Sequence, residues 1–313
     1  MRPHGTRESS ALRRVGAPSL ENLSAEWAWG GSTGAGVRVA VVDSGVEADH
    51  PDLAGAVDAE GGVMVTLDES GEPVLTPGPH DDAFGHGTAC AGIVHRLAPA
   101  ARITSVRVLG AGLSGKSAAF LAGLAWAVEQ EFDVINLSLG TSRRDWALAF
   151  YELCDRAYFG GSFLVTAANN LARPSFPSLY ASVASVACNL SREPLRFHYN
   201  PDPPTEFLAP GIDVELSWRG GGRIVGTGNS YAAPHLAGIA ALVKAKHPEL
   251  RPFQLKTVLW ATAANVREAR EPAGRLSRTM AAARRTATGA RSTAALRSVQ
   301  VSVTGDRDGR HGT

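Results

Sequence analysis

The chain has 313 residues, of which 44% are hydrophobic and 34 are glycine, and its formal net charge is +1. This length and apolar content suit one large domain with a substantial core, and the near-neutral charge argues against a nucleic-acid binder or an enzyme for acidic substrates. No run reaches the roughly 18 apolar residues of a membrane span and the start has no apolar signal region, so we expect a cytoplasmic protein.

Strand-like apolar runs alternate with helix-like segments along the chain. The runs lie at residues 37–42, 103–109, 134–139, 162–168 and 182–188, and the helical segments at 117–130, 145–158, 230–247 and 252–264. This alternation predicts an α/β fold with a mostly parallel central sheet flanked by helices. In such folds the active site lies at the carboxyl ends of the strands.

The two ends of the chain differ in composition from its middle. Residues 1–30 form a polar lead-in, residues 31–265 carry the predicted strands and helices, and residues 266–313 form an Arg/Ala-rich tail. The tail lacks a strong apolar period, which predicts that it is largely disordered. The three cysteines, Cys90, Cys154 and Cys188, are odd in number and have no metal-ligand spacing, so we expect buried reduced thiols.

Three motifs place polar side chains at strand ends or helix starts. Asp43 ends the strand in VAVVDSG, where a carboxylate could accept a phosphoryl group, bind a ribose or orient a histidine. His86 stands in GHGTACAG, and Ser230 follows a Gly-rich turn in GTGNSYAAPHLAG, where a helix-capping role is equally open. A serine becomes a nucleophile when a base takes its proton, and a carboxylate orients that base. Together the three residues predict an Asp–His–Ser triad.

The motifs DSG, HPDL, GHGT, VINLSLG, LAPG and SYAAPHLAG resemble those of the subtilisin-like serine proteases, the subtilases, over about residues 30–265. The triad of that family has the same chain order. The resemblance implies a three-layer fold and a serine endopeptidase that cleaves peptides or proteins through an acyl-enzyme on Ser230. His86 would be the general base and Asp43 its orienting carboxylate. Asn170 would stabilise the oxyanion, although the adjacent Asn169 leaves that register ambiguous by one position.

The resemblance also implies a cleft in which two backbone segments pair with the substrate as added strands. Leu109 would line a side-chain pocket, and the segment before Asn170 would form the wall of the primary pocket. The residues assigned to the cleft in this way are Leu109, Leu113, Ser114, Gly115, Ser138, Leu139, Gly140, Ala167, Ala168 and Asn169.

Two alternative functions compete with this prediction. The stretch GAGLSGKS at residues 110–117 matches the phosphate-loop pattern, which indicates a nucleotide hydrolase, but the next strand offers Asn136 where a Mg²⁺-binding Asp is needed. A peptide-binding pseudoprotease of the same fold is the other alternative. It is suggested by Asn229, where the family usually has Thr, and by Asn169, where it usually has Gly.

No cofactor is expected from the sequence. Many secreted relatives carry a calcium-binding loop in the helix after the catalytic His. Here AGIVHRLAPAARI passes directly from helix to strand, so a calcium site would have to lie in another part of the chain. Six acidic and imidazole side chains before His86 lack metal-ligand spacing, and no metal site is assigned to them. They are Asp49, His50, Asp52, His80, Asp81 and Asp82. We expect neither a nucleic acid nor a membrane partner, and the oligomeric state is left open.

Overall fold

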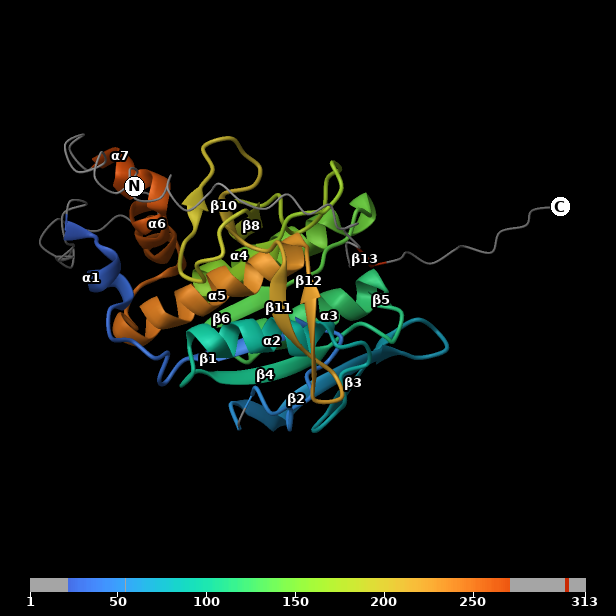
Figure 1. Cartoon of the computed structure of the whole chain (residues 1–313). Helices are drawn as coiled ribbons and strands as arrows, with labels where there is room; N and C mark the ends of the chain where they lie inside the picture. Colours follow the sequence, from blue (N-terminus) through green and yellow to red (C-terminus); the bar gives the residue numbers. More distant parts are fainter. Residues whose placement is uncertain (1–21, 54, 271–301, 304–313) are drawn as a thin grey trace, which may run out of the picture.

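The computed structural model describes residues 22–53, 55–270 and 302–303. Its middle layer is a nine-stranded sheet (Figure 1). The order across the sheet is β3 (Pro73–Pro77), β2 (Val57–Leu67), β4 (Arg102–Arg107), β1 (Arg38–Asp43), β6 (Val134–Leu137), β7 (Phe163–Ala167), β8 (Ala184–Asn189), β10 (Phe207–Pro210) and β9 (His198–Tyr199). The seven inner strands are parallel, and β3 and β9 are antiparallel edges. The predicted α/β class is confirmed.

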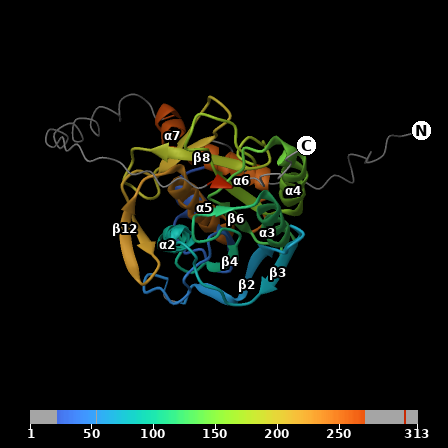
Figure 2. The ribbon, with the colours of Figure 1, turned by 90° about the vertical axis from the view of Figure 1, so that its right-hand side faces the viewer.

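Helices cover both faces of the sheet. One face carries α1 (Ala25–Trp29), α2 (His86–Leu97), α5 (Asn229–Lys246) and α6 (Pro252–Thr262), which α7 (Ala264–Arg270) follows. The other face carries α3 (Ser117–Glu129) and α4 (Ala147–Gly160), the latter preceded by the 3-10 turn η3 (Arg144–Trp146). In Figure 2 the strands β8, β6, β4 and β2 run between α2 on one side and α3 and α4 on the other.

Two short ribbons complete the fold. The hairpin of β11 (Val214–Trp218) and β12 (Gly222–Gly226) packs along α2 and against the first turn of α5 through a small apolar cluster. The short strand β5 (Ser114–Gly115) pairs in parallel with β13 (Ser302–Val303), so two residues from the far end of the chain lie beside it (Figure 1).

Alternation along β1 explains how the two faces are filled. Val39 and Val41 belong to the core cluster under α2 and α5, whereas Ala40 and Val42 belong to the cluster under α3 and α4. A strand that is buried on both faces is apolar throughout, which is why VAVV reads as a continuous apolar run. By the same period of two, Asp43 points toward the layer of α2 and α5.

The lead-in and tail predicted from composition are only partly described. Residues 1–21, 271–301 and 304–313 lie outside the described residues. Within the lead-in, Leu23, Ala28 and Trp29 are buried in the core under α5. Within the tail, residues 266–270 complete α7, and Ser302 and Val303 form β13. None of the helices in the described ranges is long and apolar enough to cross a membrane.

Close packing of α2 against α5 depends on Gly238. A Cβ atom at this position would lie 2.9 Å from the Cβ of Leu97 at the end of α2, closer than two such atoms approach in real proteins. Leu97 Cβ is attached to the backbone, so the clash is relieved only if the helices separate. The first residues of these two helices carry the candidate base and nucleophile.

We expect Gly238→Ala to lower the free energy of unfolding by about 1–3 kcal/mol, the usual scale of overpacking in a core. Gly160→Ala is the matched control, because Gly160 ends α4 and a Cβ added there would have no neighbouring atom within 4 Å. There the same substitution should be neutral or stabilise by about 0.4–1 kcal/mol. Urea unfolding of the two variants measures the difference, and equal stability of both would contradict the packing argument.

Candidate active site

Asp43 lies at the point where the order of the sheet reverses. The chain runs from β1 to β2 and β4 on one side, and then returns to β6, β7 and β8 on the other. Crevices at such a switch point, outside the carboxyl ends of the strands, are where open α/β sheets bind ligands. The carbonyl of Asp43 accepts hydrogen bonds from Val108 N at 2.8 Å and Leu109 N at 3.1 Å, which anchors the end of β1.

His86 is the first residue of α2, and its ring contacts Asp43. Nδ1 lies 2.8 and 2.9 Å from the two carboxylate oxygens, and both side chains are fully buried. A carboxylate only accepts hydrogen bonds, so Nδ1 carries the proton and the lone pair of Nε2 is free to act as a base. Gly87 permits this approach, because a Cβ there would overlap the carbonyl oxygen of Gly45.

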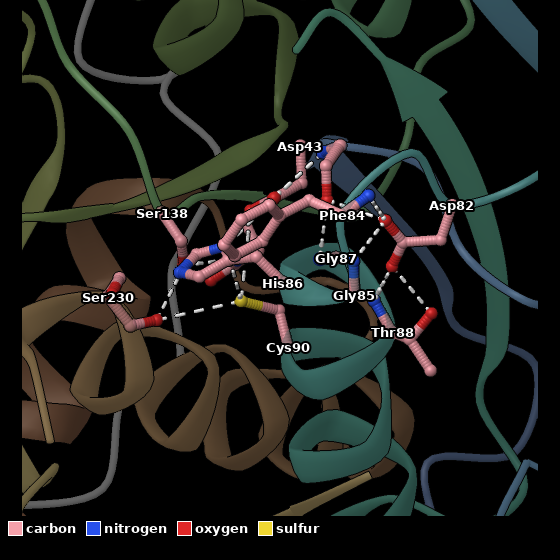
Figure 3. A network of polar contacts seen from close by, with 12 residues as sticks. Asp43, Asp82, Phe84, Gly85, His86, Gly87, Thr88, Cys90, Ser138 and Ser230 are labelled. Atoms are coloured by element: carbon pink, nitrogen blue, oxygen red, sulfur yellow. Dashed lines mark hydrogen bonds and ion pairs between the residues drawn. The ribbon is translucent and has the colours of Figure 1, made fainter. Parts of the chain in front are cut away.

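Ser230 lies in the first turn of α5 and is 2% exposed. The thiol of Cys90 lies between His86 and Ser230, with Sγ 3.9 Å from His86 Nδ1 and 3.6 Å from the carbonyl oxygen of Ser230 (Figure 3). Within the described residues, neither His86 Nε2 nor Ser230 Oγ has a hydrogen-bond partner. A nucleophile and base often meet at hydrogen-bond distance only once substrate is bound.

The backbone carbonyl of Ser230 is bonded by side chains rather than by the N–H groups of its own helix. In a helix it would accept from the backbone N–H four residues later, but that residue is Pro234, which has no N–H. Ser138 Oγ donates to it instead at 2.8 Å, and Ser138 Oγ in turn accepts from Asn136 Nδ2 at 3.0 Å. The sequence predicted only that the backbone of Ser138 pairs with the substrate. It did not predict that the buried hydroxyl of Ser138 bonds the carbonyl of Ser230. A proline four residues after Ser230 is the sequence signal for this contact, because it leaves the carbonyl of Ser230 without a donor from its own helix.

The two neighbouring asparagines have different partners. Asn170 Oδ1 accepts from the backbone N–H of Asn229 at 2.9 Å, which places this amide beside the turn that holds Ser230. Asn169 Oδ1 accepts from Leu171 N at 2.9 Å within a local turn. Of the two side chains, it is that of Asn170 that reaches the start of α5.

The subtilase family model matches residues 34–282 of this chain. The chain belongs to the subtilase family. It is 32% identical to subtilisin E of Bacillus subtilis over 268 residues, covering 80% of this chain and 65% of that protein. A thermostable alkaline protease of Halalkalibacterium halodurans is 35% identical over 246 residues, covering 74% of this chain and 63% of the relative. The chain thus spans just under two thirds of the length of these relatives.

Solved subtilase structures agree with the fold. A cold-adapted subtilisin-like serine proteinase superposes with a TM-score of 0.59 at 25% identity, covering 76% of this chain and 87% of that one. A lanthipeptide protease superposes with a TM-score of 0.57 at 27% identity, covering 70% and 77%. The three-layer architecture is therefore that of subtilisin-like proteins.

The residues predicted for the subtilase cleft fall into three groups: some are buried in the hydrophobic core, some form β5, and some lie at the ends of two sheet strands. Leu109, Leu113 and Leu139 are buried in the core cluster under α3 and α4. Ser114 and Gly115 form β5, whose edge is paired with β13. The remaining residues lie at the carboxyl ends of β6 and β7: Ser138 and Gly140 follow β6, Ala167 ends β7, and Ala168 and Asn169 follow it.

The phosphate-loop alternative fits the structure of this subtilase poorly. Such a loop turns its backbone N–H groups toward the anion and offers its last hydroxyl to Mg²⁺. Here Gly110 N donates to Ser114 O and Leu113 N to Gly110 O, so these donors are used inside the loop. Ser117 is buried, and its Oγ lies 3.1 Å from Thr141 Oγ1.

Within the candidate acidic and imidazole cluster, His50 and Asp52 contact each other, with Asp52 N donating to His50 Nδ1 at 3.0 Å, and both also bond to the β11–β12 hairpin. His50 Nε2 bonds to the carbonyls of Trp218 and Gly222, and Asp52 forms an ion pair with Arg223. Among the described residues, three possible metal ligands come together instead at Asp43, His86 and Cys90. These side chains are buried and belong to the candidate active site. The helix α2 runs unbroken to Leu97 and β4 begins at Arg102, as the predicted lack of a loop insertion requires.

All three cysteines are free, and Cys90 and Cys154 are buried. Burial raises the pKa of the Cys90 thiol, which therefore stays neutral near pH 7. For His86, burial disfavours the charged ring, but the charge and hydrogen bond of Asp43, together with the contact of Cys90, outweigh burial and hold the pKa of His86 above its ordinary value of 6.5. Below this raised pKa the ring is the imidazolium, and above it the ring is neutral with its proton on Nδ1 and a free lone pair on Nε2.

This raised pKa predicts the pH dependence of any reaction that uses His86 as a base. Below its pKa the ring is protonated and cannot accept a proton, so kcat/KM should rise with pH through a midpoint above 6.5. Asp43→Asn should move that midpoint down, because the stabilising charge is removed. A kcat/KM profile between pH 5 and 10 measures both, and a midpoint that Asp43→Asn leaves in place would contradict the assignment of the cause.

Proposed function

We propose that this subtilase is a serine endopeptidase that cleaves peptide bonds through an acyl-enzyme on Ser230. The observation that carries the proposal is the contact of His86 Nδ1 with the Asp43 carboxylate, beside a serine in the first turn of a helix. This contact holds the ring in the tautomer whose Nε2 accepts a proton. The protease names of its relatives agree with this chemistry.

The reaction needs two proton transfers in each half. Ser230 Oγ attacks the substrate carbonyl while His86 Nε2 takes its proton, and His86 then gives that proton to the leaving amine as the C–N bond breaks. In the second half a water molecule loses its proton to His86 and attacks the ester. The proton returns to Ser230 Oγ as the acid product leaves. The Asp43 carboxylate stabilises the imidazolium in both halves.

The oxyanion would be held by Ser230 N–H and by the side-chain amide of Asn170. Ser230 N is among the first N–H groups of α5, which have no acceptor inside the helix. Asn170 binds Asn229 N through its oxygen, so its NH₂ group points to the other side of that amide. Two such donors aimed at the developing charge lower the barrier because they are already oriented.

The substrate would add a strand to the edge of β5. The parallel pairing of Ser302 with Ser114 and of Val303 with Gly115 supports this, since it demonstrates that the edge accepts an extended segment. Backbone hydrogen bonds of this kind are independent of side-chain identity, so they favour peptides and proteins as a class. Preference among sequences would then come from side-chain pockets.

A pseudoprotease is the second candidate, because Asn229 and Asn169 depart from the family pattern. The structure gives Asn229 a stabilising role: its Oδ1 accepts from Cys188 N at 2.9 Å, and its Nδ2 donates to the carbonyls of Ala168 and Asn169 at 3.2 Å each. These bonds join the start of α5 to the segment that carries Asn170. They favour the catalytic proposal, because they hold the nucleophile and the oxyanion donor together.

Reaction with a fluorophosphonate probe separates protease from pseudoprotease. We expect the full chain to be labelled at Ser230, because only a serine with a working base and oxyanion donors reacts quickly. Ser230→Ala should lose both labelling and peptide hydrolysis, whereas Ser191→Ala, in a surface loop, should lose neither. Mass spectrometry locates the adduct, and a wild-type chain that stays unlabelled would favour the pseudoprotease.

Replacing each asparagine in turn tests the register of the oxyanion donor. Asn170→Ala should lower kcat by about 10²–10³ with little change in KM, a scale that was measured on a subtilisin and is carried over here. Asn169→Ala is the control, because its side chain closes a local turn, and its kcat should stay near the wild-type value. The opposite result would move the donor to Asn169.

A further inference from the structure

A second buried carboxylate, that of Asp82, lies beside the triad without being part of it. Asp82 is 5% exposed and its two oxygens accept five hydrogen bonds (Figure 3). The donors to Oδ1 are Ser44 Oγ at 2.7 Å, Phe84 N at 3.0 Å and Gly85 N at 2.7 Å. The donors to Oδ2 are Thr88 N at 2.8 Å and Thr88 Oγ1 at 2.6 Å.

These partners are three backbone N–H groups and two hydroxyls rather than a basic side chain. Burying a carboxylate is costly unless its lone pairs are satisfied, and here five donors satisfy them. The helix α2 begins with Gly85 as its N-cap, which has no side chain to bond the free N–H groups. Asp82 takes over this role from three residues upstream, and its negative charge suits the positive end of the helix.

The same carboxylate is also tied to the strand that carries Asp43. Ser44 follows Asp43 directly, and its hydroxyl both donates to Asp82 and accepts from Gly87 N at 3.1 Å. The N–H of Ser44 in turn donates to Asp43 Oδ1 at 2.7 Å. Every link from Asp82 therefore ends on a residue adjacent to Asp43 or within two positions of His86.

We propose that Asp82 is a positioning residue, which holds the end of β1 and the start of α2 in the register that brings Asp43 and His86 into contact. This inference rests on the proposed peptidase function. Asp82 touches no reacting atom and acts through Ser44 and through the backbone on both sides of His86. Its own sequence signal is a carboxylate four residues before the histidine, ahead of a helix start with no capping side chain.

Replacing this carboxylate by an amide puts a donor against backbone N–H groups, which cannot accept a hydrogen bond. Asp82→Asn keeps the size of the side chain, but in either orientation its NH₂ group faces a backbone N–H, that of Thr88 or those of Phe84 and Gly85, so at least one hydrogen bond is lost. We expect kcat to fall by up to about 10²-fold, the scale for a catalytic group displaced by about 1 Å, with KM nearly unchanged. Asp81→Asn, the exposed neighbour, is the matched control and should retain wild-type kinetics.

A double-mutant cycle separates positioning from general stabilisation. If Asp82 acts through the contact of Asp43 with His86, then Asp82→Asn should cost no more than about two-fold in kcat once Asp43→Ala is already present. If Asp82 serves only to cap α2, the full loss should recur in that background. Recurrence of the full loss would overturn the proposal.

Titration of His86 by NMR gives a readout that needs no activity. The ionisable groups facing the ring are Asp43 from β1, Cys90 from α2 and Tyr231 from α5, and all are kept in the variants. In full-length Ser230→Ala protein, adding Asp82→Asn should lower the pKa of His86, because the Asp43 carboxylate is no longer held against it. An unchanged pKa would overturn the proposal even if the chain proved to be a pseudoprotease.

Ser44→Ala provides a second variant should Asp82→Asn fail to fold. It removes the tie to β1 and the acceptor of Gly87 N, but it leaves the bonds of Asp82 to Thr88, Phe84 and Gly85, so Asp82 still caps α2. The positioning role predicts the same direction of change in kcat and in the pKa of His86, by a smaller factor. Wild-type values for both in Ser44→Ala would contradict it.

Discussion

The contact between the Asp43 carboxylate and the His86 ring is the interaction on which the rest of the site depends. Both groups are fully buried, so each needs the other and a surrounding set of donors to make burial tolerable. Asp43 obtains further donors from Ser44 N and from the Cys90 thiol. The chain provides this environment because β1 ends, and α2 begins, at the same edge of the sheet.

Two glycines and one proline set how the helices that carry His86 and Ser230 pack at the site. Gly238 brings α5 against the end of α2, and Gly87 brings the start of α2 against the turn after β1. Pro234 lacks the N–H that would bond the carbonyl of Ser230, so this carbonyl is bound by Ser138, just after β6, instead. The backbone of Ser230 is thereby bonded to the end of a sheet strand as well as to its own helix.

Local patterns predicted five of the seven parallel inner strands and neither edge strand. The five predicted strands appear as β1, β4, β6, β7 and β8, because strands buried on both faces are short continuous apolar runs. The edge strand β3 is largely exposed, and β2 is interrupted by AEGG, where its register against β4 shifts between Asp58 and Val63. Such segments lack both a continuous run and a clean alternation, so their pairing is set by neighbouring strands.

The sequence by itself determined the fold class and the family, and it singled out Asp43, His86 and Ser230, because each motif couples a polar residue to a local strand end or helix start. Tertiary structure decided which of two adjacent asparagines reaches Asn229, and that Asp82 joins β1 to α2. The physical reason is that periodicity reports which way a side chain points, whereas a hydrogen bond between distant segments depends on where the fold has brought its partner.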